Sequence, residues 1–112
     1  MDRDPAYVAD IVNACHEIGS FLGQHSKDEF LSDRMAMSAV VRQLEIIGEA
    51  TKRLSAAFRA KHAEIPWKEM AGLRDVLIHL YDEVDWDLVW DIATTKVSAV
   101  GTTLARLLPP SA

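Results

Sequence analysis

The sequence predicts an all-α fold: an antiparallel up-down bundle of four long helices plus short helical turns. Apolar residues recur at intervals of three and four along most of the 112 residues. Alternating patterns typical of strands are lacking, and the links between periodic stretches are short enough to join antiparallel neighbours. Hydrophobic residues make up 49 % and charged residues 26 %, which is the range of globular proteins. We therefore expect a single domain over residues 1–112.

The first long helix is expected to open at Asp4, which would cap it, with Pro5 at the first helical position. Its end is predicted at Gly23. Ser26 and Glu29 then form a capping-box pattern, which predicts a short helical turn. The apolar residues at helical spacing in the first helix are Val8, Ile11, Val12, Cys15, Ile18, Phe21 and Leu22.

The second long helix is expected to start after Asp33, which would cap it, and to run about six turns. The stretch from Ser55 to Ala63 is basic and is predicted to link the helices through a helical turn. The apolar stripe of the second helix contains Met37, Val40, Val41, Leu44, Ile47 and Leu54.

The third long helix is expected to begin near Pro66, because proline suits the first turn, and to end near Leu80. Asp85 would cap the last helix, whose apolar residues continue at helical spacing to Leu107. The two prolines at 109 and 110 would stop it.

Several classes of protein are disfavoured by composition. Cys15 is the only cysteine, so an internal disulfide and a cysteine-based zinc site are excluded, and a buried small hydrophobe is the simplest interpretation. No set of His, Asp or Glu has a convincing metal-site spacing, and no Gly-rich phosphate loop is present. The N-terminus lacks the apolar region of a signal peptide, and no apolar run approaches the ~20 residues that span a bilayer. We expect a cytoplasmic protein that uses no metal, no cofactor and no membrane.

The charge is unevenly distributed. The net charge of −5 argues weakly against simple coating of nucleic acid, yet the stretch from Lys52 to Arg74 holds six bases and two acids, a local charge of +4. A local basic patch can recruit a polyanion even on an acidic protein, although a solvated face is the usual role of such a run. The candidate contacts are Lys52, Arg53, Arg59, Lys61 and Lys68.

Arg74, His79 and Tyr81 lie close together on one apolar element. Histidine is the side chain that serves as general base or acid near neutral pH, and arginine matches phosphate with paired donors. Together they suit RNA cleavage without a metal: His79 would take the ribose 2′-OH proton, Arg74 would stabilise the phosphorane, and a 2′,3′-cyclic phosphate would result. Tyr81 could bind a phosphate or stack a base. The spacing alone leaves open that Arg74 and His79 form ordinary ion pairs, for example with Asp75, and that Tyr81 packs at the core edge.

The pattern Arg74-x4-His79-x-Tyr81 resembles the motif of HepT-like toxins of the HEPN superfamily. Three further segments resemble the same family: LEIIGEA at 44–50, IPWKEMAGLRD at 65–75 and VDWDLVW at 84–90. Four similar segments in the same order cover nearly the whole chain, which is far more specific than the Arg-x4-His pattern alone.

The resemblance implies a helical bundle that forms a homodimer, with the motifs of two subunits meeting in a cleft. It implies a metal-independent endoribonuclease, catalytic through Arg74 and His79, that cleaves tRNA or mRNA as the toxin of a type VII-like toxin–antitoxin pair. The partner would be an MntA-like nucleotidyltransferase antitoxin that transfers AMP to Tyr81. A phosphodiester at that position would block RNA and compete for Arg74.

A second function class stays open at this point. The chain would then be a non-catalytic dimeric module, antitoxin-like, that serves as partner or substrate of the nucleotidyltransferase. A structural bundle that carries the motif by chance is the third interpretation. The sequence does not say which RNA is cleaved, or whether this chain is the toxin or the antitoxin of its pair.

Overall fold

The computed structural model describes residues 2–79 and 84–108, with side chains for all of these except residues 74–79. Helices dominate this part of the chain, no strand occurs in it, and the all-α prediction is therefore confirmed. The elements are α1 (Asp4–Leu22), α2 (Lys27–Leu31), α3 (Arg34–Arg53), α4 (Ala56–Lys61), α5 (Trp67–His79), α6 (Trp86–Asp91), the π-helical segment η1 (Ile92–Lys96) and α7 (Val97–Ala105).

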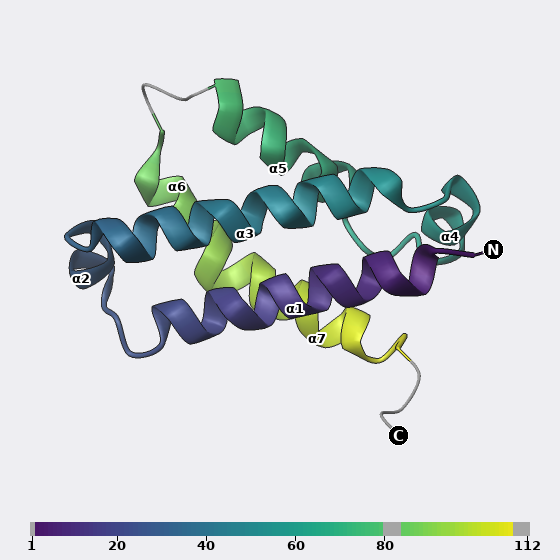
Figure 1. The fold of residues 1–112 in the computed structure, drawn as a ribbon, viewed down its shortest axis with the longest axis horizontal. Helices are drawn as coiled ribbons and strands as arrows, with labels where there is room; N and C mark the ends of the chain where they lie inside the picture. Colours follow the sequence, from purple (N-terminus) through teal and green to yellow (C-terminus); the bar gives the residue numbers. More distant parts are fainter. Residues whose placement is uncertain (1, 80–83, 109–112) are drawn as a thin grey trace.

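The long helices run up and down, as the sequence predicts. Figure 1 shows α1 and α3 as antiparallel neighbours, with α5 lying over α3 and the run α6–η1–α7 returning along the bundle. The fourth long helix of the prediction is present, but η1 divides it, so its turns are not uniform. None of the helices in the two described ranges is long and apolar enough to cross a membrane.

Three of the predicted helix starts are confirmed by their caps. The Ser26 hydroxyl accepts from the Glu29 N–H at 3.2 Å while the Glu29 carboxylate accepts from the Ser26 N–H at 2.8 Å, which completes the capping box of α2. Asp33 accepts from the Ala36 N–H at 3.1 Å, and Asp85 accepts from the Leu88 N–H at 3.1 Å. These caps need only residues three apart, so the sequence alone reveals them.

The cap predicted at Asp4 is wrong. Asp4 is already the first residue of α1, and its own N–H donates to the carboxylate of Asp2 at 2.9 Å. The Asp4 carboxylate instead accepts from the N–H and the hydroxyl of Ser55, at 2.8 and 2.6 Å. These hydrogen bonds lower the pKa of Asp4. The bond joins the start of α1 to the start of α4, across 51 residues of sequence.

The core lies between α1, α3 and the last helical run. Its fully buried side chains include Ile11 and Ile18 from α1, Leu44 from α3 and Leu104 from α7. α1 and α7 approach closely at Gly101, where an added Cβ would lie 2.9 Å from the Cβ of Cys15. The main packing partner of α5 is α3, so α5 is attached to the bundle chiefly from one side.

Candidate functional site

α5 carries the residues that the sequence singles out for catalysis. The helix starts after Pro66, whose carbonyl accepts from the Met70 N–H at 3.1 Å, and its first turn is anchored by buried Trp67 and Met70. Arg74 and His79 both lie within α5, as expected. On a regular helix they are about 7.5 Å apart along the axis and about 140° around it. Their side chains, and Tyr81 as a whole, lie outside the described residues, so their predicted roles stay predictions.

The first turn of α5 is tied to α4 by the indole of Trp67. Its Nε1 donates to the carbonyl oxygens of Arg59 and His62, at 3.1 and 2.9 Å. The Phe58 ring packs against the rings of Trp67 and His62, with centroid distances of 5.9 Å and 4.6 Å. The indole therefore satisfies carbonyls at the end of α4 that would otherwise lack helical partners. The sequence marks Trp67 as a helix start but gives no sign of this contact.

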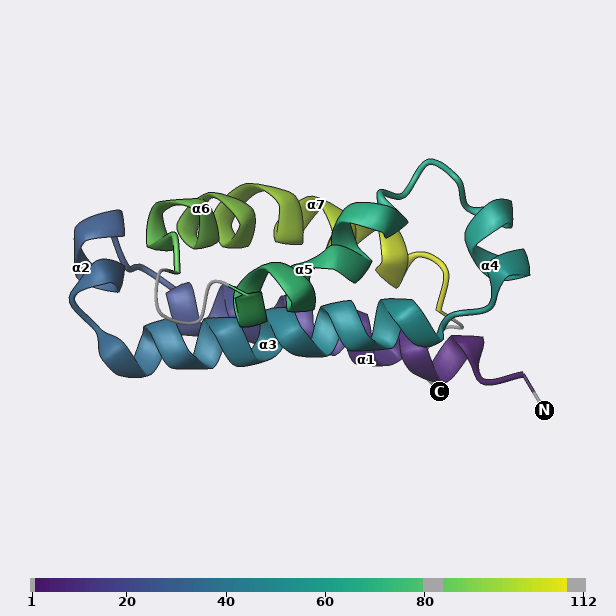
Figure 2. The same cartoon turned by 90° about the horizontal axis from the view of Figure 1, so that it is seen from above.

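The five candidate polyanion contacts come from three elements that meet at one end of the bundle. Lys52 and Arg53 are the last two residues of α3, Arg59 and Lys61 lie on α4, and Lys68 is the second residue of α5. Figures 1 and 2 both show α4 at the end where α3 stops and α5 begins. Arg74 and His79 lie in the other half of α5, so the basic end and the catalytic motif are separated along the helix.

The charges of these residues are not equally available. The Arg53 Nη2 lies 2.9 Å from a Glu49 carboxylate oxygen, so its charge is partly neutralised. Lys61 and Lys68 are exposed. Arg59 is half-buried, and within the described part of the chain its Nε has no hydrogen-bond partner.

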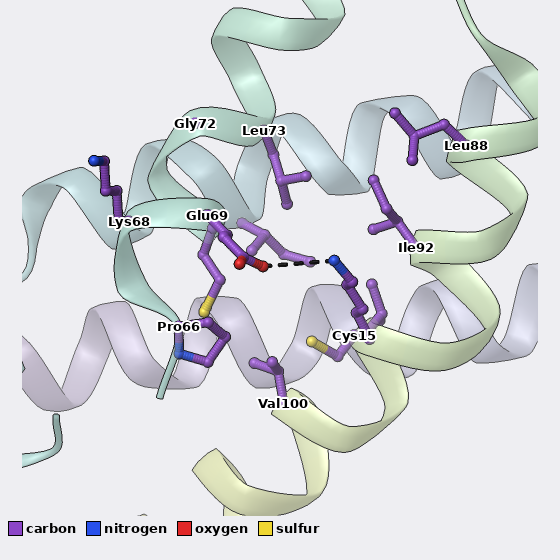
Figure 3. Close-up of a pocket in the computed structure, with 13 residues that line it drawn as sticks. Cys15, Pro66, Lys68, Glu69, Gly72, Leu73, Leu88, Ile92 and Val100 are labelled. Atoms are coloured by element: carbon purple, nitrogen blue, oxygen red, sulfur yellow. Dashed lines mark ion pairs between the residues drawn. The ribbon is translucent and has the colours of Figure 1, made fainter. Parts of the chain in front are cut away.

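An apolar groove of about 450 Å³ separates α5 from the last helical run. Figure 3 shows Leu73 from α5 facing Leu88 and Ile92 across it, with Cys15 below. Glu69 and Lys96 span it with an ion pair at 3.5 Å, and both side chains are about two-thirds exposed. The lining offers hydrophobic contact and little hydrogen bonding, so the groove suits packing rather than chemistry.

Cys15 is a buried thiol with no catalytic environment around it. Burial raises the pKa of the Cys15 thiol to about 11, so it stays protonated near neutral pH and is a poor nucleophile. Among the residues that the structure describes, no group of three or more His, Cys, Asp or Glu is placed to hold a metal ion.

Comparison with known proteins gives a consistent result. The sequence profile of a family described as "Ribonuclease HepT-like" matches residues 11–107. A Methanocaldococcus jannaschii protein named "Putative RNase" is 44 % identical over 92 residues, which cover 82 % of this chain and 76 % of that protein. A Thermococcus cleftensis protein named "Probable ribonuclease HepT" is 45 % identical over 84 residues, covering 75 % of this chain and 76 % of that protein. No solved structure matches the chain.

Proposed function

Because the chain belongs to the HepT-like ribonuclease family, we propose that it is a toxin-type endoribonuclease that cleaves RNA through Arg74 and His79 without a metal. The observation that carries the proposal is the extent of the family match, which runs from residue 11 to residue 107 and includes the Arg74-x4-His79-x-Tyr81 pattern. The relatives named as ribonucleases support the same activity.

In the proposed reaction, His79 accepts the proton of a ribose 2′-OH while the 2′ oxygen attacks the adjacent phosphorus. Arg74 donates hydrogen bonds to the phosphoryl oxygens, where negative charge develops in the transition state. The bond from phosphorus to the 5′ oxygen breaks, and an acid protonates that oxygen. A protonated His79 from a second subunit fits this last role, since the motifs of a homodimer would share one cleft. The products are a 2′,3′-cyclic phosphate and a free 5′-OH.

Control of the activity is assigned to Tyr81. A partner nucleotidyltransferase of the MntA type would transfer AMP from ATP to its phenolic oxygen and release pyrophosphate. The added phosphodiester would bring a negative charge beside Arg74 and would compete there with the RNA phosphate. Tyr81 follows His79 by two residues in the sequence, so an AMP group on it would be carried next to the catalytic motif.

The test is cleavage of tRNA and of mixed mRNA in EDTA by the unmodified protein, after intact mass has excluded bound AMP. The wild type should produce ends with a cyclic phosphate. The His79→Ala variant should lose the activity, and Arg74→Ala should lose most of it, by roughly 100- to 1,000-fold. A Tyr81→Phe variant should cleave RNA but resist inactivation by the nucleotidyltransferase and ATP.

Absence of cleavage by the unmodified wild type would refute the proposal. The non-catalytic partner of a nucleotidyltransferase would then be the better assignment. Expression of each protein alone and together in a host distinguishes the two roles, since only the toxin arrests growth alone.

A further inference from the structure

α4 is not held in place by burial in the core. The helix has six residues and none of them is buried. A helix this short is unstable by itself, and its hydrophobic contact with the core comes from the partly buried Phe58. Its position must therefore depend on other contacts, and its exposed face is free for another role.

Two specific contacts fix α4 at its two ends. At the start, Ser55 accepts from the Phe58 N–H at 3.0 Å while it donates to Asp4 of α1 at 2.6 Å. At the end, the Trp67 indole of α5 donates to the carbonyls of Arg59 and His62. The helix that carries Arg59 and Lys61 is thus attached to α1 at its start and to the first turn of α5 at its end.

Two lysines of this region, Lys61 and Lys68, are exposed. Neither Lys61 nor Lys68 has an ion-pair partner among the described side chains, those of residues 2–73 and 84–108. Of the two acids of the region, Glu69 lies 3.5 Å from Lys96, and Glu64 is exposed with its carboxylate 4.0 Å from a ring nitrogen of His62. The free lysines are therefore available to an anionic ligand.

The distance from Lys68 to the motif is fixed by α5 itself. Lys68 and His79 are eleven residues apart on one continuous helix, which corresponds to about 17 Å at 1.5 Å per residue. A stacked nucleic-acid strand advances about 3.4 Å per nucleotide, so the gap corresponds to about five nucleotides. α4, which carries Arg59 and Lys61, lies beyond the start of α5 in both views (Figures 1 and 2).

We propose that Arg59, Lys61 and Lys68 form a phosphate-contact surface, the α4 surface, which holds single-stranded RNA five or more nucleotides from the bond that is cut. The inference rests on the proposed ribonuclease function and adds a minimum substrate length to it. RNA is the favoured ligand because the exposed Lys61 and Lys68 lie near the start of α5, the helix that carries Arg74 and His79, whereas the segment after Arg74 is acidic, with six acids and two bases. An acidic ribonuclease needs a separate basic surface to retain a polyanion.

Binding of labelled oligouridylates by the full-length His79→Ala protein tests the surface without cleavage of the probe. The oligouridylates range from about two to about twelve nucleotides, and fluorescence anisotropy is read at several salt concentrations. Affinity should rise with length past about six nucleotides, the length that reaches Lys68, and level off once the strand also covers α4. Adding Lys61→Ala and Lys68→Ala should lower the salt slope by about 1.4, since each single-strand phosphate contact contributes about 0.7. Near 0.1 M salt this corresponds to roughly 25-fold weaker binding.

The matched control is Arg42→Ala in the same background. Arg42 is an exposed cation on α3 that lies 3.7 Å from Glu45 and borders a pocket with Tyr7 and Asp10 rather than α4. Its loss should leave both the salt slope and the length dependence unchanged. Circular dichroism melts of all variants establish that the surface substitutions do not unfold the protein, and Lys61→Gln with Lys68→Gln should repeat the loss.

Equal RNA affinity of the lysine variant and its parent would overturn the inference, as would an affinity independent of length. Loss of nucleotidyltransferase binding with RNA binding intact would overturn it too, because the surface would then belong to a protein partner. These results are separable from the proposed function. If the wild type cleaves RNA and the loss of Lys61 and Lys68 has no effect, the ribonuclease function is supported and the α4 surface is refuted. If the wild type binds RNA as described and never cleaves it, the α4 surface is supported and the ribonuclease function is refuted.

Discussion

Gly101→Ala should destabilise the protein relative to Gly19→Ala, although both replace a glycine inside a helix. A Cβ at position 101 in α7 would lie 2.9 Å from the Cβ of Cys15 and 3.5 Å from its sulfur. A Cβ at position 19 in α1 would meet nothing within 4 Å. A Cβ cannot rotate away from its backbone, so the two helices must move apart in the first case and need not move in the second.

The magnitude follows from two opposing effects. Replacing glycine by alanine inside a helix stabilises it by about 1 kcal/mol, and this gain applies at both positions. Forcing an additional methyl into a packed interface costs about 1–3 kcal/mol, and this cost applies only at Gly101. Gly19→Ala should therefore gain about 1 kcal/mol, and the free energies of unfolding of the two variants should differ by about 1–3 kcal/mol.

Urea unfolding followed by circular dichroism, at one protein concentration, measures this difference. With a slope near 2 kcal/mol per molar, a difference of 2 kcal/mol separates the two midpoints by about 1 M urea. Adding Cys15→Gly to Gly101→Ala should recover part of the loss, whereas Cys15→Ala retains the conflicting Cβ and should recover less. If Gly101→Ala is as stable as Gly19→Ala, the close approach of α1 and α7 is refuted.

Three further predictions concern burial and titration. Phe30→Ala should lower the free energy of unfolding by about 3–5 kcal/mol, because Phe30 is fully buried and its ring lies 5.4 Å from that of Trp90; Phe30→Leu is the milder control, and urea unfolding compares them. Wild type should lose its stability advantage over Asp4→Asn as pH falls below about 4, because the lowered native pKa of Asp4 stabilises the fold only while the carboxylate is charged; an unchanged difference at pH 3 would contradict this. The Cys15 thiol, whose pKa is raised to about 11, should react with a disulfide reagent at pH 8 far more slowly than the same thiol in urea, and equal rates would show that it is accessible.

The helices were predictable from the sequence because their signals are local. The Ser26–Glu29 box and the cap at Asp85 involve residues three apart, and the apolar spacing identifies the buried face of α3. The motif residues Arg74 and His79 were correctly placed on a helix for the same reason.

Contacts between distant residues were not predictable. The Asp4 carboxylate accepts hydrogen bonds from Ser55 instead of capping its own helix, because folding brings the start of α4 beside the start of α1. The Trp67 indole and the close approach at Gly101 likewise depend on how helices meet, which residue periodicity does not encode. The common location of the basic residues at one end is a structural finding, whereas their contact with RNA stays a prediction.

The π-helical segment η1 has a consequence for the length of the chain. Val89 and Val97 are both buried. On a regular α-helix, residues eight apart point in directions about 80° apart around the axis. A π-helical turn holds one extra residue, which reduces this angle to about 20°. The exposed residues Thr94 and Thr95 lie in that turn, with their hydroxyls bonded back to the carbonyls of Trp90 and Asp91. The helix thus contains one residue more than its buried face requires. Deleting Thr94 or Thr95 should give an uninterrupted α-helix that keeps the same residues inside, so sequences of this kind can differ in length here and share one fold.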